Sequence, residues 1–466
     1  MADNSSNSEM VCYAESSKTA ALGWTTLAFF AGFAGVSAFG PIVSRLKETM
    51  EIGAFLVGLL SACPSLTGSL LRIPFGAAVD RVGGKKPILI LLGLAGLGII
   101  CITLLFAFFP QPTVAQYPLF LLSGILCGCG IAIFSVGIPS VSYWYPQKKQ
   151  GSALAAYAGF GNLAPGIFAM LLPSMVEFMG FKLSYSVWFA FALVIFLLVL
   201  IFMKDAPYFQ YKQMGIEIDP DALMHACGEE LLPSGGAADS LKKAGANWRT
   251  WILTFFYFIN FGGFIALTVW FPTYWSEFFK ISIVMAGILT AAYSLSSSLL
   301  RVLGGWIADR LTGETVTLFS FIIVITGSIL MVLVSGSFGL ALAGQMLMAL
   351  GMGFANAAVF KLVPRYTPAA VGGASGIVGG LGAFGGFVIP PLMGLFVKIS
   401  PVKGYSNGFL VFTILTLIAL ALLYVLYRFP PESASSYSYS YSYSYAIPGC
   451  LFQTTVKPSC LISAAA

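Results

Sequence analysis

Two arginines stand inside apolar stretches of this chain, at matching places in two similar segments. Arg72 lies in SLLRIPFGAAVDR and Arg301 lies in SLLRVLGGWIADR. A permanent cation at the depth of a membrane needs a cavity or a partner of opposite charge. Each guanidinium can donate two parallel hydrogen bonds to a planar anion such as a carboxylate or nitrate. The pair therefore predicts a site for a small planar anion between two equivalent helices.

The surroundings of the two arginines lack acids. Asp80 and Asp309 follow the arginines by eight residues and are expected at the membrane rim, which places the arginines about 12 Å deeper at ~1.5 Å per residue. An unpaired arginine at that depth disfavours insertion by ~2.5 to 3.5 kcal/mol. A structural ion pair would remove this cost, but the candidate acids fall at span ends or in loops: Glu51, Glu177, Glu277 and Glu314. The missing partner is therefore predicted to be the substrate.

The composition is that of a membrane protein. Only 9% of the 466 residues are charged, 58% are hydrophobic and 15% are aromatic, whereas a soluble chain carries about 25% charged residues. An apolar helix of ~20 residues crosses a hydrocarbon core ~30 Å thick and satisfies its own backbone groups. Twelve such helices are predicted, near residues 23–42, 53–78, 87–109, 117–144, 151–174, 184–203, 250–275, 283–308, 315–335, 337–360, 370–397 and 406–427.

The twelve spans form two similar sets of six. Arg72, Asp80 and Arg81 align at one constant offset with Arg301, Asp309 and Arg310, the parallel repeat expected of transporters. The predicted fold class is an all-α integral membrane protein with two pseudo-symmetric six-helix bundles. Its predicted parts are a cytoplasmic N-terminal segment (1–20), a first bundle (21–203), a cytoplasmic linker (204–249), a second bundle (250–428) and a low-complexity, disordered cytoplasmic tail (429–466).

The charges predict orientation rather than a nucleic-acid partner. The net charge is +6, but the basic residues are scattered among short loops and form no continuous stripe. Thirteen Lys and Arg fall in the loops after even-numbered spans and six in the other loops, so both termini are predicted to be cytoplasmic. Within the linker, a short amphipathic helix is expected near DPDALMHACGEELL, with the sole histidine, His225, as a loop residue.

Metal, disulfide and enzyme chemistry find no support in the residue types. Four of the eight cysteines, Cys63, Cys101, Cys127 and Cys129, lie in predicted spans and make no metal-like pairs. They are expected to be small buried apolar residues. No cluster of acid, base and nucleophile occurs. The chain is therefore expected to hold no metal and no cofactor, and not to be an enzyme.

Polar and aromatic residues within the spans are further candidates for the site. Tyr257 and Phe261 lie one helical turn apart in YFINFGGF, Phe134 lies in the fourth span, and Asn162 lies within AGFGNLAPG. A buried tyrosine hydroxyl or asparagine amide needs a hydrogen-bond partner. Glycines in the same span, Gly159, Gly161 and Gly166, and others between residues 372 and 386 allow close helix packing and gating motions.

Charged residues after the second and eighth spans predict a second device. Asp80, Arg81, Asp309 and Arg310 stand at helix ends on the predicted cytoplasmic side. Such residues can pair with the next helix and lock that side shut until the protein opens inward. Orientation by positive charge is an alternative role for the basic residues, and the two roles are compatible.

The motifs resemble a known family. GAAVDRVGGKKP and its reduced echo GWIADRLTG resemble the loop signature of the major facilitator superfamily, whose twelve spans match about residues 20–428. The segments PSLTGSLLRIPFG, YPQKKQGSALA, GFGNLAPG, YFINFGGF and LGAFGGFVIPP resemble the nitrate/nitrite porter branch. The resemblance implies that Arg72 and Arg301 bind the anion and that Phe134, Tyr257 and Phe261 lie against it. It also maps glycine-rich signatures onto Gly159, Gly161 and Asn162, and onto Gly382, Gly385 and Gly386.

These patterns together predict a monomeric plasma-membrane transporter of nitrate, nitrite or both, as in nitrate assimilation. Exchange of one anion for another is the leading mechanism, because the histidine and the carboxylates are expected outside the core. Proton-coupled symport and uniport are alternatives. A transporter of a small carboxylate such as formate or oxalate would use the same arginines, and a sensor that binds an anion without moving it belongs to a different class.

Overall fold

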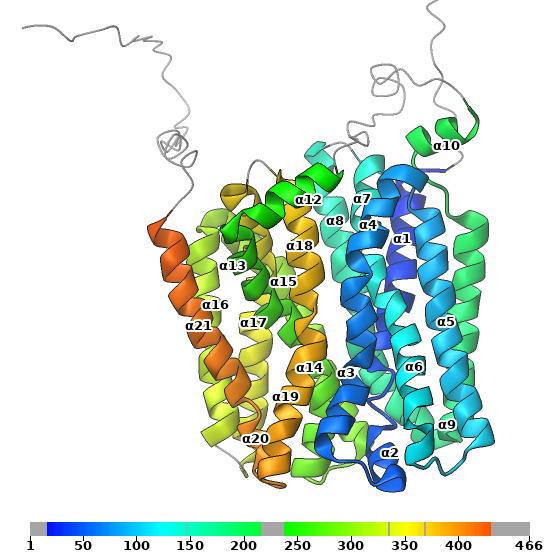
Figure 1. Ribbon diagram of the computed structural model, residues 1–466, viewed down its shortest axis with the longest axis vertical. Helices are drawn as coiled ribbons and strands as arrows, with labels where there is room; N and C mark the ends of the chain where they lie inside the picture. The colour runs from blue at the N-terminus through cyan, green and yellow to red at the C-terminus, as the bar shows by residue number, and fades with distance from the viewer. Residues whose placement is uncertain (1–15, 146, 216–236, 334–335, 368–369, 430–466) are drawn as a thin grey trace, which may run out of the picture. The chain divides into compact units, whose positions relative to one another are not determined.

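The computed structural model describes residues 16–145, 147–215, 237–333, 336–367 and 370–429. These residues are helical almost throughout, and the helices of the first and second halves form two groups side by side (Figure 1). The helix predicted near residues 219–232, His225 and the tail after Phe429 lie outside the described residues.

The helical segments of the first half are α1 (Lys18–Phe33), η1 (Ala34–Ser37), α2 (Val43–Met50), α3 (Ala54–Leu70), α4 (Arg72–Val82), α5 (Lys85–Phe108), η2 (Val114–Gln116), α6 (Tyr117–Gly128), η3 (Cys129–Ala132), α7 (Ile133–Trp144), α8 (Gln147–Gly161) and α9 (Ala164–Phe202). Two helices of the linker are described, α10 (Pro207–Gln213) and α12 (Ala237–Ala246).

The second half contains α13 (Trp248–Tyr257), η4 (Phe258–Gly262), α14 (Gly263–Thr273), η5 (Tyr274–Phe278), α15 (Ile283–Arg310), α16 (Gly313–Leu333), α17 (Phe338–Tyr366), α18 (Val371–Ala383), α19 (Gly385–Ile399), α20 (Gly404–Asn407) and α21 (Leu410–Arg428). The segments η4 and η5 are π-helical turns within the seventh span, whereas η1, η2 and η3 are 3₁₀ turns.

The predicted spans agree with the helices. Among the described residues, eleven helical runs are long and apolar enough to cross a membrane. One of them, Ala156–Phe202, has 47 residues, about 70 Å of helix at ~1.5 Å per residue and far more than a ~30 Å core needs. Gly180 interrupts it with φ of 76°, a conformation that favours glycine. This run therefore supplies two spans, the predicted fifth and sixth, and the all-α membrane fold is confirmed.

The start of the first span differs from the prediction. The first helix begins at Lys18 rather than at residue 23, because the Ser17 side chain accepts a hydrogen bond from the N–H of Ala20 and caps it. Four cysteines of the described spans are free thiols, and three of them, Cys63, Cys127 and Cys129, are buried.

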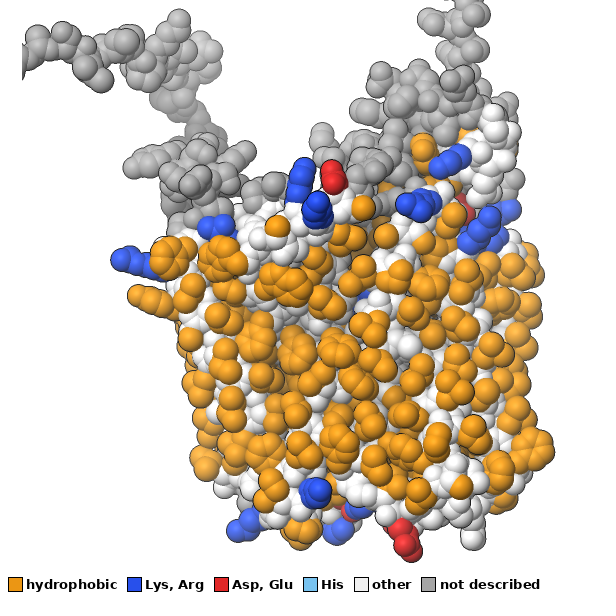
Figure 2. Space-filling view, in the orientation of Figure 1, with side chains coloured by type: hydrophobic (Ala, Val, Ile, Leu, Met, Phe, Trp, Pro, Cys, Tyr) orange, Lys and Arg blue, Asp and Glu red, His pale blue; other side chains and the backbone are white. Residues whose placement is uncertain are grey.

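Apolar side chains cover the face of the molecule seen in Figure 2 as a broad band, and the charged side chains gather above and below it. The short helices α10 and α12 lie at one end of the long, apolar helices, which we call the linker end. The short helices α2 and α20 lie at the opposite end, which we call the far end (Figure 1). The band between the two ends is the pattern of a protein that spans a membrane many times.

The two bundles meet along pairs of helices from opposite halves. The second span packs against the eleventh through α3 and α19, and the fifth packs against the eighth through α9 and α15. A Cβ atom on Gly58 would stand 2.9 Å from the carbonyl oxygen of Pro390, and one on Gly394 would stand 2.7 Å from that of Ala54. Glycine thus lets backbones of the two bundles approach closely, as is typical of membrane helices.

The GAAVDRVGGKKP loop has a structural explanation within the first bundle. Gly83 has φ of 79° and lies against the Asp205 carboxylate, which accepts a hydrogen bond of 2.8 Å from the N–H of Lys85 at the start of α5. Burial raises the pKa of Asp205, while the N–H donors of Lys85 and Gly84 act in the opposite direction. Asp205 therefore ties the end of the sixth span to the start of the third.

Candidate functional site

A break in the second span positions Arg72. Helix α3 ends at Leu70 and α4 begins at Arg72, with Leu71 between them. Pro74 has no N–H to donate to the carbonyl of Leu70, so the regular ladder of helical hydrogen bonds is interrupted here. The Arg72 side chain, directly after this break, lies inside the protein, where it is 2% exposed.

The Arg72 guanidinium joins the two bundles. Its Nε donates to the carbonyl oxygen of Gly68 at 3.1 Å, in its own span, and its Nη1 donates to that of Gly379 at 2.9 Å, in α18 of the other bundle. Nη2 is buried and has no hydrogen-bond partner among the described residues. One arm of the fork is therefore bonded within the protein and the other is available to a ligand.

Arg301 and Arg72 share two aromatic rings. The Arg72 Cζ lies 4.9 Å from the ring centroid of Phe134 and 5.0 Å from that of Phe261. The Arg301 Cζ lies 5.9 and 5.7 Å from the same two centroids. These distances are within the range of cation–π attraction, and they place the two cations no more than about 11 Å apart, the sum of their distances to either ring.

The two rings come from opposite bundles. Phe134 lies in α7 and Phe261 in the π-helical turn η4, with centroids 6.0 Å apart and planes inclined by 28°. The turn η4 inserts an extra residue into the helical repeat of the seventh span, a feature that often marks functional sites. It leaves the Tyr257 and Phe261 rings stacked, with centroids 5.0 Å apart and planes 9° apart.

Tyr257 is expected from the sequence to need a hydrogen-bond partner for its hydroxyl. Its side chain is fully buried, and its hydroxyl has no hydrogen-bond partner among the described residues. The Phe360 ring meets the Tyr257 ring edge-on at 4.8 Å, and the Tyr257 ring stacks on that of Phe261, which Arg72 also approaches. The hydroxyl is therefore a further polar group beside the arginine pair.

Asn162 lies where α8 ends and α9 begins, three residues before Pro165. Its carbonyl accepts a hydrogen bond of 3.0 Å from the Ser298 hydroxyl in α15, one turn before Arg301. Its Oδ1 is buried without a partner among the described residues. The structure thus joins Asn162 to the helix of Arg301 through its backbone, whereas its side chain has no recorded contact with the arginines.

Five of the six predicted glycines lie at close contacts with other helices, and Gly159 does not. A Cβ on Gly382 would stand 2.7 Å from the Tyr257 ring, one on Gly161 would meet the Phe29 ring, and one on Gly386 would stand 2.8 Å from Ile265. Gly166 packs on Leu295, Gly385 on the Phe258 carbonyl, and Gly159 has room, with Val302 at 4.0 Å. The absence of a side chain at Gly382 and Gly161 therefore leaves room for the rings of Tyr257 and Phe29.

The predicted latch is described only in part. The side chains of Asp80 and Asp309 lie outside the described ones. Arg81 and Arg310 are exposed, and the Arg310 guanidinium stacks 3.7 Å from the centroid of Trp306 in its own helix. The latch stays a prediction.

Charge around the arginine pair is not balanced by the described protein groups. In the described ranges, the ion pairs involve Glu277 and Glu314, and neither carboxylate pairs with Arg72 or Arg301. Glu314 is buried near the linker end between Arg365, at 2.9 Å, and the Tyr366 hydroxyl, at 2.8 Å. The positive charge at the centre is therefore open to an anion.

Tyr157 is a residue of the site that sequence reasoning missed. It is fully buried, and its hydroxyl donates to the carbonyl oxygens of Ile133, at 2.9 Å, and Phe134, at 3.1 Å. Its ring lies 5.2 Å from that of Phe29, which in turn lies 5.4 Å from Phe134. The signal was a tyrosine within an apolar span, the same signal that singled out Tyr257.

Comparison with known proteins identifies the family. The sequence model of the Major Facilitator Superfamily matches residues 25–337 and, in a second alignment, residues 253–441. The chain belongs to the Major Facilitator Superfamily. Its fold agrees with this superfamily's solved structures: the xylose transporter XylE of E. coli covers 90% of this chain with a TM-score of 0.67 at 14% identity, all of that chain being matched. A bacterial homologue of the lysosomal transporter Spinster gives 0.63 at 14% identity, over 89% of this chain and 98% of that one.

Several curated relatives are named as transporters of nitrate or nitrite. A nitrite extrusion protein of Bacillus subtilis is 28% identical over 404 residues, 86% of this chain and 93% of the relative. A probable nitrate/nitrite transporter of Mycobacterium tuberculosis, NarK2, is 29% identical over 82% of this chain and 89% of its own length. A probable nitrate transporter of Staphylococcus haemolyticus, NarT, is 28% identical over 86% and 95%. The resemblance to nitrate/nitrite porters is confirmed.

Gly382→Ala tests the close packing of α18 against the Tyr257 ring. The added methyl group would push on the Tyr257 ring, and such overpacking costs about 1–3 kcal/mol. We expect a lower midpoint of thermal unfolding in detergent. Gly376→Ala in the same helix is the control, because its nearest neighbour is a Leu241 methyl at 3.9 Å. An equal midpoint for the two variants would contradict the packing described.

Proposed function

We propose that this chain is a transporter of nitrate, nitrite or both that works by alternating access with one central anion site. The observation that carries the proposal is the pair of cations, Arg72 and Arg301, one from each bundle, which lie against the same two aromatic rings. No described carboxylate forms an ion pair with either of them. The names of the relatives support the same substrates.

The free donors favour a small planar anion. Arg72 Nη2 and Arg301 Nη1 are both buried without partners among the described residues. A guanidinium donates in its own plane, so two forks that converge on one ion suit oxygens that also lie in a plane. The flat rings of Phe134 and Phe261 offer faces to such an ion, and Tyr257 and Asn162 provide further polar groups.

Binding from two bundles couples the anion to the conformational change. An anion held by Arg72 touches the first bundle, and the same anion held by Arg301 touches the second. Without the anion, two cations approach each other as the bundles close, and the repulsion opposes closure. The bound anion removes the repulsion and stabilises the closed state through its preferential binding to that state.

Anion exchange follows from this coupling. If the empty site resists closure, the protein returns across the membrane only when it carries another anion. In the described part of the chain, no carboxylate or histidine lies in contact with the arginine pair, so nothing there serves as a proton carrier. The linker end is proposed to be cytoplasmic, and Asp80, Arg81, Asp309 and Arg310 are proposed to form the latch on that side.

Replacement of either arginine by lysine tests whether the guanidinium group binds the anion through two parallel hydrogen bonds. Arg72→Lys and Arg301→Lys keep the charge but lose bidentate donation, and we expect nitrate affinity to fall about 10- to 100-fold, since hydrogen bonds to charged groups contribute roughly 1.5–3 kcal/mol. Equilibrium binding of labelled nitrate to the purified protein measures this. The matched control is Arg45→Lys, which removes a fork that bonds the Pro110 carbonyl near the far end. Unchanged affinity in both site variants would contradict the proposed site.

Counterflow in liposomes tests exchange. Liposomes loaded with nitrite are expected to take up labelled nitrate several-fold faster than empty liposomes, with or without a pH gradient, because exchange needs an anion on the return step. Strict dependence on the proton gradient would instead establish symport, and equal rates without internal anion would establish uniport. Inhibition by formate or oxalate as strong as that by unlabelled nitrate would point to a small carboxylate as the substrate.

A further inference from the structure

A charged contact joins the two bundles at the far end. Lys47 in α2 donates from Nζ to Glu277 Oε2 at 3.0 Å, at the end of the seventh span, and to the Tyr405 hydroxyl at 3.3 Å, in α20. Lys47 belongs to the first bundle, whereas Glu277 and Tyr405 belong to the second. Of the ion pairs formed by the described residues, this one crosses between the bundles, since the pairs of Glu277 with Lys280 and of Glu314 with Arg365 lie within the second.

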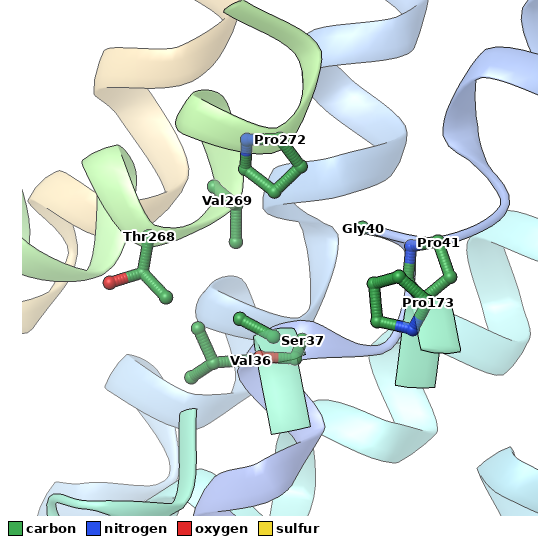
Figure 3. Close-up of a pocket in the computed structure, with 9 residues that line it drawn as sticks. Val36, Ser37, Gly40, Pro41, Pro173, Thr268, Val269 and Pro272 are labelled. Atoms are coloured by element: carbon green, nitrogen blue, oxygen red, sulfur yellow. The ribbon is translucent and has the colours of Figure 1, made fainter. Parts of the chain in front are cut away.

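Other contacts between the two bundles lie at the same end of the molecule. Just inside that end, α3 and α19 pack backbone to backbone at Ala54 and Gly394. A small cavity lies between the bundles at this end, with Ser37, Gly40 and Pro41 on the side of the first and Thr268 and Pro272 on the side of the second (Figure 3). Pro272 lies two residues before the start of the π-helical turn η5, which carries Glu277. Entry from the far end to the arginine pair therefore requires these contacts to separate.

We propose that Lys47 and Glu277, with the Tyr405 hydroxyl, form a latch that holds the far end closed and breaks each time that end opens. The proposal rests on the alternating access proposed above. Hydrogen bonds of 3.0 and 3.3 Å break when the two bundles separate by a few ångströms at the rim. The latch is thus the far-end equivalent of the one predicted at the linker end.

The environment makes the latch weak enough to open repeatedly. The side chains of Lys47 and Glu277 are 30% and 17% exposed, so water and salt screen their attraction, and both ions regain full hydration when they part. Burial by itself lowers the pKa of Lys47, but the hydrogen bond to Glu277 outweighs this with the help of Tyr405, and the pKa is raised. The ammonium group therefore stays charged at physiological pH.

Accessibility of the far-end cavity tests the proposal. Ser37→Cys places a thiol at this cavity, and its rate of reaction with a membrane-impermeant thiol reagent reports how often the far end opens. Rates are corrected with the chain that keeps Ser37, because that chain carries the same eight native cysteines. In this background, Lys47→Gln and Glu277→Gln are each expected to speed the reaction about two- to fivefold, the upper part of the range for loss of a partly exposed ion pair.

Lys280→Gln is the matched control. Lys280 approaches the same Glu277 carboxylate at 3.7 Å, but it belongs to the same bundle and its side chain is 77% exposed. Its replacement changes the charge by the same amount without crossing the interface, and we expect the labelling rate of Ser37→Cys to change less than twofold. An effect as large as that of Lys47→Gln would overturn the proposal, because it would reveal a general effect of charge.

Two double variants separate a broken latch from a damaged fold. Lys47→Gln with Glu277→Gln is expected to react no faster than the faster single variant, since one contact is lost only once. Lys47→Glu with Glu277→Lys restores a pair of opposite charges and is expected to slow the reaction toward that of the parent. Wild-type rates in the single variants, or no recovery in the exchanged pair, would overturn the latch.

The same proteins distinguish this proposal from the proposed function. Labelling is measured without nitrate, so faster reaction of the Lys47 and Glu277 variants supports the latch whether or not nitrate binds. Nitrate affinity measured in parallel tests the anion site alone. If the labelling rates change as expected but nitrate does not bind, the latch is supported and nitrate is excluded as the substrate. If nitrate binds normally but the labelling rates do not change, the anion site is supported and the latch is excluded.

Discussion

The structure depends on two cations, the buried Arg72 and the half-buried Arg301, that the described protein groups do not neutralise. Arg72 donates hydrogen bonds to two carbonyl oxygens and lies against the rings of Phe134 and Phe261. Arg301 approaches the same two rings from the other bundle. Carbonyl oxygens and ring faces attract a guanidinium without cancelling its charge. They can therefore hold both groups in place and still leave the net charge for a substrate. A carboxylate in this position would have formed a structural ion pair and left no reason to bind an anion.

The elements around the cations serve to bring them together from distant parts of the chain. The second span is interrupted at Leu71, directly before Arg72, and the π-helical turn in the seventh span carries Phe261, whose ring stacks on that of Tyr257. Tyr157 holds Phe134 from behind through the carbonyl of that residue. Gly382 keeps the space that the Tyr257 ring occupies. The two bundles meet at this centre through the Phe134 and Phe261 rings and through the hydrogen bond from Arg72 to the Gly379 carbonyl.

Hydropathy and the internal repeat were enough to predict the spans and the arginine pair, because a membrane demands long apolar helices and penalises an isolated charge. The breaks within spans were not predictable from hydropathy, which is blind to backbone hydrogen bonds. Contacts across the bundle interface, such as Phe134 with Phe261 or Lys47 with Glu277, depend on the packing of helices far apart in sequence. Glu277 was assigned correctly to a span end, but its partner lies 230 residues away.

Thermal unfolding of a variant without the two charges tests the central claim most directly. Arg72→Met with Arg301→Met replaces the buried Arg72 and the half-buried Arg301 by apolar side chains, which is often stabilising when a charge lacks a partner. In buffer free of small planar anions, the double variant is predicted to unfold at a higher temperature than the wild type, and added nitrate is predicted to stabilise the wild type alone. A double variant that unfolds at a lower temperature than the wild type without nitrate, with no stabilisation of either protein by nitrate, would show that the protein neutralises the arginines itself and would contradict the account.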